Sequence, residues 1–244
     1  FMVDRAASDV TIGGGPAAST NDVTPTIVGS AVGAAGETVK VTFDPPGTTD
    51  DVIRTAVVQV DETWNVTPSL SPGVWSVLAE VTDEAGNTGD FTQTLTVDLT
   101  APAVAITSDA LTNDPTPTIT GTTEDGATIS VSINGLAVTL DSTSTGTAWS
   151  ATPTAVLVDG IHNVLVTATD AVGNTATVTQ VLTVDTTPPA LTVVHVAVTN
   201  DPRPAITGIT EAGATIAVEL EGNDAVFDVV LDGTAWSATP TSDL

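Results

Sequence analysis

The sequence lacks several residue types on which many protein functions depend. It has no cysteine and no tyrosine, Lys and Arg together number 4, and aromatic residues make up 3% of its 244 positions. Without cysteine it can form neither a disulfide nor a thiol-based site. Against 30 Asp and Glu, this shortage of basic residues gives a formal net charge of −26. Such a chain repels nucleic acid and anionic lipid, so we expect neither as a partner.

Two further features are missing from the sequence. The first residues show no basic start followed by an apolar run, so no secretory leader is visible. No apolar stretch is long enough to cross a bilayer, so we expect no direct membrane insertion. Because the chain starts and stops inside a repeat, it reads as an excerpt, and targeting signals are expected elsewhere.

What the sequence does contain is a long internal repeat. Three kinds of landmark return at intervals of 87 or 92 residues: Thr20-Asn21-Asp22 with Thr112-Asn113-Asp114 and Thr199-Asn200-Asp201, Thr82-Asp83 with Thr169-Asp170, and Asp98 with Asp185. A fixed period of this length indicates tandem domains. We therefore predict a first domain over 1–97, with a linker remnant at 1–8, a second over 98–184 and an incomplete third over 185–244.

The second repeat shows the fold class best. Short alternating segments rich in Val, Ile and Thr, separated by turn residues, predict seven strands at 103–107, 118–122, 127–133, 136–140, 149–152, 162–169 and 176–184. This pattern is typical of an all-β, immunoglobulin-like sandwich. The third repeat lacks the last two strands, so we expect it to be the least stable part. Gly13-Gly14-Gly15-Pro16 is interpreted as a linker insertion.

The segments between repeats are short and contain proline. Residues 97–102 and 184–189 lead from the last strand of one domain to the first strand of the next with little slack. Proline stiffens such a segment. The sequence therefore predicts an elongated monomeric array in which each repeat contacts its neighbours in the same chain.

Acidic side chains are expected to gather where domains meet. In an immunoglobulin-like domain, the turns after the second and sixth strands lie at the end where the chain enters. Crowded carboxylates need a cation, the chain has few basic residues, and Ca²⁺ prefers carboxylate and carbonyl oxygens. We therefore predict calcium at the junctions, with these candidate ligands: Asp98, Glu124, Asp125, Asp170, Asn174, Asp22, Asp185, Glu211, Asp114, Asp83, Glu37 and Asp4. The alternative is that these Asp and Asn residues simply form turns.

Several of the same motifs carry a family resemblance. Three of these motifs recur between repeats. They are Asp-x-Thr-x-Pro at 98–102 and 185–189, Thr-Asn-Asp-x-Thr-Pro-Thr-Ile at 20–27 and 112–119, and Thr-Asp-x-x-Gly-Asn. Together they resemble the bacterial Ig-like repeats of giant biofilm-associated and RTX-type surface adhesins. The resemblance implies secretion to the cell surface, calcium-stiffened junctions and a stalk role in cell adhesion and biofilm formation, with the adhesive target bound by another domain.

Carried over by position, the resemblance assigns metal-ligand loops to part of the acidic set. The matching residues are Asp98, Glu124, Asp170, Asp185 and Glu211. The first repeat departs from the pattern, because Asp4 is not followed by the Thr and Pro of the junction motif. Its site, which would use Glu37 and Asp83, is the least well matched.

Other functions have weaker support in the sequence. Trp64, Trp149 and Trp236 recur at one place in each repeat; an aromatic sugar platform is conceivable, but we expect core packing. His162 and His195 do not recur and are expected on strand surfaces. No nucleophile motif or phosphate loop is present, so we expect no enzyme. A carbohydrate- or receptor-binding module and a spacer of a secreted enzyme stay open as alternatives.

Overall fold

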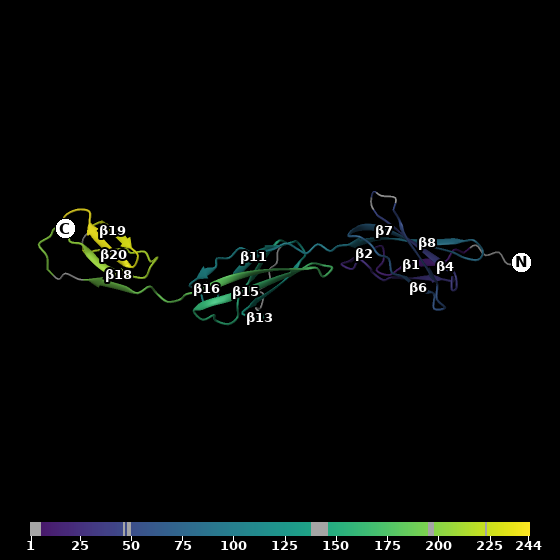
Figure 1. The fold of residues 1–244 in the computed structure, drawn as a ribbon, viewed down its shortest axis with the longest axis horizontal. Coiled ribbons are helices and arrows are strands. Elements are labelled where there is room, and N and C mark those ends of the chain that lie inside the picture. Colours follow the sequence, from purple (N-terminus) through teal and green to yellow (C-terminus); the bar gives the residue numbers. More distant parts are fainter. Residues whose placement is uncertain (1–5, 46, 48–49, 138–145, 195–197, 223) are drawn as a thin grey trace.

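The chain folds into three β-domains that follow one another along one long axis (Figure 1). The computed structural model describes residues 6–45, 47, 50–137, 146–194, 198–222 and 224–244. Asp4 and His195 therefore lie outside the described residues. No helix within these ranges is long and apolar enough to cross a membrane.

The first domain is a sandwich of two sheets. One sheet has the order β1-β3-β6 and consists of β1 (Asp9–Ile12), β3 (Ile27–Val32) and β6 (Thr63–Val66). The other has the order β2-β8-β7-β4-β5, with β2 (Ala17–Thr20), β8 (Thr88–Val97), β7 (Gly73–Thr82), β4 (Thr38–Asp44) and β5 (Val52–Val57).

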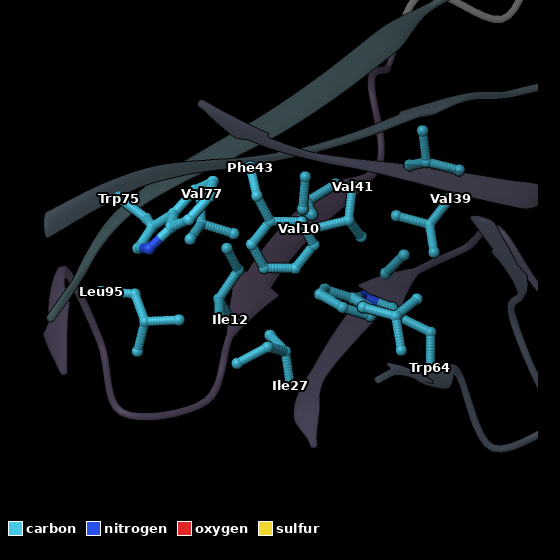
Figure 2. Packing of buried hydrophobic residues seen from close by; sticks show 14 of the residues in the cluster. Val10, Ile12, Ile27, Val39, Val41, Phe43, Trp64, Trp75, Val77 and Leu95 are labelled. Carbon is cyan, nitrogen blue, oxygen red and sulfur yellow. The ribbon is translucent and has the colours of Figure 1, made fainter. Parts of the chain in front are cut away.

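The two layers of the first domain enclose one apolar core (Figure 2). Along β4 the residues Val39, Val41 and Phe43 are buried while the residues between them are more exposed, which is the period-two pattern of a strand with one buried face. Trp64, on β6, fills the core from the opposite layer. Each large apolar side chain buried in this way stabilises the fold by about 1.5–3 kcal/mol.

The second domain repeats this plan. One sheet has the order β14-β11-β9, with β9 (Val104–Ile106), β11 (Ile119–Thr123) and β14 (Ala148–Ala151). The other has the order β10-β16-β15-β12-β13, with β10 (Leu111–Thr112), β16 (Thr175–Val184), β15 (Gly160–Thr169), β12 (Thr128–Ile133) and β13 (Leu136–Ala137). The immunoglobulin-like, all-β fold predicted from the sequence is confirmed.

The seven-strand prediction for this domain missed one short strand. Residues 111–112 form β10, which pairs in parallel with β16, so the first strand of the sandwich is split between the two sheets. The same split occurs in the first domain, where β1 pairs with β3 and β2 pairs in parallel with β8. A two-residue strand has no alternating pattern to detect. Of the predicted strand 136–140, residues 138–140 lie outside the described residues.

The interpretation of Gly13-Gly14-Gly15-Pro16 as a linker insertion was wrong. These residues lie inside the first domain, between β1 and β2, where the chain crosses from one sheet to the other. Gly14 and Gly15 have φ values of 88° and 75°, which favour glycine. The buried Gln93 amide donates hydrogen bonds to the carbonyls of Gly13 and Gly15, at 2.9 and 2.7 Å, and so fixes the crossing.

The third domain has a single sheet within the described residues. Its order is β17-β18-β20-β19, with β17 (Leu191–Val194), β18 (Ile206–Thr210), β20 (Ala235–Pro240) and β19 (Phe227–Asp232). The first three strands correspond to β9, β11 and β14 of the second domain. Residues 214–218 alternate between half-buried and exposed as β12 does, but they form no ladder.

Candidate functional site

Four acidic residues line one cavity at the junction between the first and second domains. The cavity has a volume of about 280 Å³. Asp98 comes from the linker, Glu124 and Asp125 come from the turn before β12, and Asp170 comes from the turn after β15. Ser19 and Thr96 of the first domain complete one wall, and among the described residues neither Lys nor Arg contributes to the lining. The predicted grouping of acids from three separate loops is therefore present in the structure.

The Asp170 carboxylate also organises its own loop. One oxygen, Oδ1, accepts hydrogen bonds from the backbone N–H groups of Val172, Gly173 and Asn174 at 2.7–2.9 Å. The other, Oδ2, accepts one from the Asn174 side-chain amide at 2.8 Å. Burial opposes ionisation and is the largest single influence on the pKa of Asp170, but the bonds from Asn174, Val172 and Gly173 together outweigh it and lower that pKa below 3.8.

The equivalent loop of the first domain is built in the same way. The Asn87 side chain and the Asn87 backbone N–H both donate to Asp83, at 2.8 Å, and lower the pKa of Asp83 below 3.8. The recurrence of Thr-Asp-x-x-Gly-Asn is therefore explained by loop stabilisation in both domains. The loop-forming role is compatible with cation binding, because the same hydrogen bonds favour the charged form of the carboxylate.

The linker at the first junction is hydrogen-bonded on both sides. The Asp98 N–H donates to the carbonyl of Thr20 in the first domain, at 2.9 Å. The Asp98 carbonyl accepts a hydrogen bond from the Asn174 side chain in the second domain, also at 2.9 Å. The side-chain amide nitrogen of Asn21, Nδ2, lies 3.5 Å from the position that a β-carbon on residue 173 would occupy. The turn at 20–22 of the first domain therefore approaches the second domain through the Asn21 side chain.

At the second junction, Asp159 of the second domain binds the linker. Its Oδ1 accepts hydrogen bonds from the N–H and hydroxyl of Thr186, at 3.1 and 2.7 Å, and its Oδ2 accepts one from the Thr187 hydroxyl at 2.9 Å. The bonds from Thr186, and then the one from Thr187, hold the pKa of Asp159 below its ordinary value. Asp185 lies in the same linker, and its N–H donates to the carbonyl of Thr112 at 2.9 Å.

The recurrent Thr-Asn-Asp motif forms a local double turn. The hydroxyl of Thr112 accepts the Asp114 N–H at 3.0 Å, and the Asp114 carboxylate accepts the N–H of Thr116 at 2.8 Å. The same pair of bonds forms around Asp22 and around Asp201. The turn-forming alternative raised by the sequence thus accounts for the geometry of Asp22 and Asp114.

The remaining predicted calcium ligands, Glu37 and Glu211, do not line the cavity at the first junction. Glu37 lies in the turn before β4 and Glu211 in the turn after β18. No hydrogen bond among the described residues joins Glu37 to Asp83, or Glu211 to Asp185. Within the described ranges, no group of three or more His, Asp or Glu side chains is arranged closely enough to hold a metal ion.

The first junction nevertheless has the donor chemistry that calcium prefers. Its lining offers four carboxylates and carries no positive side chain, and hard divalent cations favour oxygen ligands. Among the described contacts, neither Glu124 nor Asp125 uses its carboxylate in a hydrogen bond, so both remain available to a cation. The residue types at this junction therefore fit calcium.

Comparison with known proteins agrees with the architecture. A model of the bacterial Ig-like domain matches residues 6–99 and again residues 104–186.

The chain belongs to the bacterial Ig-like domain family. No curated protein matches its sequence. Among solved structures, a tetra-tandem repeat from the extending region of a large adhesion protein is 25% identical, with a TM-score of 0.35; the comparison covers 96% of this chain and 62% of that one. A fragment of a 1.5-MDa bacterial ice-binding adhesin is 22% identical over 97% of this chain and 88% of that one, with a TM-score of 0.40. The family assignment rests on the sequence match.

The tryptophans of the bacterial Ig-like repeats are core residues, as predicted. Trp64, Trp149 and Trp236 are all buried, and so is Trp75. A stacking platform for sugars needs an exposed ring, and none of these four tryptophans provides one.

The prediction that His162 lies on a strand surface was wrong, since its side chain is only 5% exposed. His162 takes the place of Trp75 in the first repeat. The Trp75 indole N–H donates to the carbonyl four residues earlier, that of Ser71, at 2.9 Å. His162 Nε2 lies 2.8 Å from the equivalent carbonyl, that of Val158. Its Nδ1 lies 2.9 Å from the amide nitrogen of Asn134, so the Nε2–H tautomer satisfies both contacts.

Two repeated pairings were missed by the sequence reasoning. Gly29, Gly121 and Gly208 each lie opposite the recurring tryptophan of their own domain. Gln93 and Gln180 each donate to the crossing between the two halves of the first strand. Both sets recur close to the domain period, which was the signal available in the sequence.

Proposed function

We propose that this chain is an extender segment of a large bacterial surface adhesin. In this role its domains hold a separate binding domain away from the cell and so support adhesion and biofilm formation. The role requires export from the cell and a stiff array. The end-to-end arrangement of domains and the hydrogen bonds that anchor both linkers support it. An extending role is also what the description of the tetra-tandem adhesion repeat names for that protein.

The proposal includes calcium at the first junction. Asp98, Glu124, Asp125 and Asp170 would hold the ion, because these are the carboxylates that line the shared cavity. When bound, calcium would supply the positive charge that the lining lacks and would accept oxygen ligands from both the linker and the second domain. The observation that carries this proposal is that acids from three separate loops line one cavity with no basic residue among them.

Asp98 and Asp170 have distinct tasks in this account. Asp98 sits in the linker, so a cation that it shares with Glu124 would fix the linker to the second domain. Asp170 is kept ionised by its loop hydrogen bonds, so it presents a negative charge without the proton that calcium would otherwise have to displace. Ligand binding to the ordered junction alone would then stabilise that arrangement by mass action.

Small-angle scattering of the full chain tests the proposal. With millimolar CaCl₂ the longest dimension should increase and the spread of conformations should narrow, and a chelator should reverse both without unfolding the domains. The variant Glu124→Gln/Asp125→Asn should lose this response, whereas Asp90→Asn, an exposed aspartate on β8, should keep it. Calorimetric titration with CaCl₂ measures binding directly.

The two parts of the proposal fail separately. An identical scattering profile with calcium and with chelator, together with no heat of binding, would remove calcium. A broad distribution of domain orientations under both conditions would remove the stiff extender itself.

A further inference from the structure

The outer face of the third domain carries an apolar groove. The groove has a volume of about 300 Å³, and the residues that line it are Val194, Thr207, Gly208, Ile209, Val230, Asp232, Ala235, Trp236 and Ser237. Three of its aliphatic side chains are largely exposed: Val194 at 61%, Ile209 at 58% and Val230 at 56%. Exposed apolar side chains that cluster around a hollow are typical of an interaction site.

The strand register explains the shape of this groove. Trp236 lies opposite Gly208 on the core face, so their neighbours Ala235 and Ser237 point to the outer face. Ile209 lies opposite Ala235 from β18, and Val230 lies opposite Ser237 from β19. The small residues Ala235 and Ser237 of β20 thus form the floor of the groove, and Ile209 and Val230 form its two walls. A trough that follows a strand in this way suits an extended peptide with alternating side chains.

At two positions of this surface the other repeats carry no aliphatic side chain. The positions of Val194 and Ile209 are occupied in the second repeat by Thr107 and Thr122, 87 residues earlier. Thr107 there lies within hydrogen-bonding distance of the Thr120 hydroxyl, 3.2 Å away. In the first repeat the corresponding positions are Gly13, bonded to Val28, and Ser30. The sandwich therefore forms without aliphatic residues at these positions, and packing within the domain does not account for them.

Charge limits what can occupy the groove. Asp232 lines it, and Asp228, four residues earlier on the same side of β19, is also exposed. Residues 185–244 contain nine Asp and Glu and one Arg. A second copy of the chain would bring a like charge against this surface, which opposes association. A partner with basic side chains beside apolar ones would meet complementary charge.

We propose that this groove binds an extended segment of another protein, in which Lys or Arg alternates with aliphatic residues. The aliphatic side chains enter the trough between Ile209 and Val230. The basic side chains reach Asp228 and Asp232 at its rim. This site is separate from the junction and does not depend on calcium.

The test titrates a synthetic eight-residue peptide of alternating Val and Lys into the full chain, with binding followed by NMR shifts and calorimetry. The double variant Val194→Thr/Ile209→Thr restores the residues of the second repeat, so the fold should tolerate it. We expect it to weaken binding by about tenfold or more, because the buried aliphatic area is lost. The control Ile161→Thr/Val181→Thr removes two exposed aliphatic residues from the outer face of the second domain and should bind as the unmodified chain does.

Two further measurements keep the proposal falsifiable if the Thr variant unfolds. Asp228→Asn/Asp232→Asn should weaken binding and flatten its dependence on salt. A peptide with Glu in place of Lys should not bind. Equal binding of the Lys and Glu peptides, or unchanged binding by either double variant, would overturn the proposal. So would self-association of the chain that shields Ile209 and Val230 in place of the peptide.

Discussion

Gly121 lies directly opposite Trp149 in the ladder between β11 and β14, and the indole ring of Trp149 covers the place where a side chain of residue 121 would stand. A β-carbon built on Gly121 would approach both the Trp149 ring and the Ala105 carbonyl to less than 3.0 Å. The indole N–H donates to the neighbouring Thr122 carbonyl at 3.1 Å. The glycine therefore allows the tryptophan to lie flat across its strand, and the same pair recurs as Gly29–Trp64 and Gly208–Trp236.

Replacing Gly121 by alanine should destabilise the second domain. The added methyl group meets backbone on one side and a buried ring on the other, and neither can move without shifting a strand. We expect a loss of about 3 kcal/mol in the free energy of unfolding, the upper end for overpacking. Urea unfolding followed by tryptophan fluorescence measures it. Thr122→Ala, at an exposed position on the same strand, should cost less than about 0.5 kcal/mol, and equal losses in the two variants would contradict the pairing.

Stability should fall in acid through the two Asp-x-x-Gly-Asn loops. Hydrogen bonds lower the pKa values of Asp83 and Asp170 below 3.8 in the folded chain. A lowered folded-state pKa gives stability that is fully present well above the ordinary aspartate pKa, and this stability is lost progressively as the pH falls through that value to the folded-state pKa. We therefore expect the unfolding temperature to decline below about pH 5.

The variants Asp83→Asn and Asp170→Asn separate these loops from other acidic groups. Each should be less stable than the unmodified chain at pH 7 and should show a smaller decline on acidification, since the ionised form is no longer present. Thermal unfolding at intervals between pH 7 and pH 3 measures how steeply the unfolding temperature falls with decreasing pH. A slope as steep in both variants as in the unmodified chain would show that other carboxylates cause the decline.

The two junctions should respond differently to the loss of Asp159. At the second junction this carboxylate binds Thr186 and Thr187 of the linker. The corresponding residue in the first domain is Pro72, which has no carboxylate to offer. Asp159→Ala should therefore loosen the third domain relative to the second and leave the first junction unchanged. NMR relaxation, which reports the tumbling of each domain, measures the difference, and coupled motion of all three domains in the variant would refute this role.

The third domain should open more easily than the other two. On the core face of its sheet, Leu191 and Val193 are exposed beside the buried Trp236. In the second domain, Val164 and Val166 of β15 are fully buried under the equivalent sheet. Backbone amides of β18 should therefore exchange with deuterium faster than those of β11 and β15. Equal protection in β18 and β11 would mean that the single sheet is stabilised in some other way.

The fold was largely predictable because the alternation of apolar and polar residues along each longer strand shows which of its faces is buried. In β4 and β15, apolar residues alternate with polar ones, and Gly or Asn-Gly turns separate the strands. The parts of the fold that were missed have no such pattern in their own sequence. β10 is two residues long and is defined by its pairing with β16, and the crossing at 13–16 is held by Gln93, about 80 residues away.

The candidate site was predictable to the level of which loops meet. The repeat period and the sandwich topology correctly brought Asp98, Glu124 and Asp170 to one cavity. The sequence could not distinguish carboxylates that organise their own loop from those that face the cavity freely. Asp170, Asp22 and Asp114 accept backbone N–H groups two to four residues ahead, and that preference is shared by any turn-forming aspartate. His162 was misplaced because a buried histidine needs two specific partners, Asn134 and Val158, which only the fold assembles.

The parallel pairing of each domain's early strand with its final strand has a mechanical consequence. Thr20 and Val97 are paired neighbours in the first domain, as Thr112 and Val184 are in the second, and in each pair the two strands run in the same direction. Tension applied at the two ends of a domain therefore drags these strands past each other in opposite senses. The hydrogen bonds between them, such as the one from the Asp98 N–H to Thr20, then have to rupture together instead of one after another. A tether made of such domains resists a sudden pull before it yields.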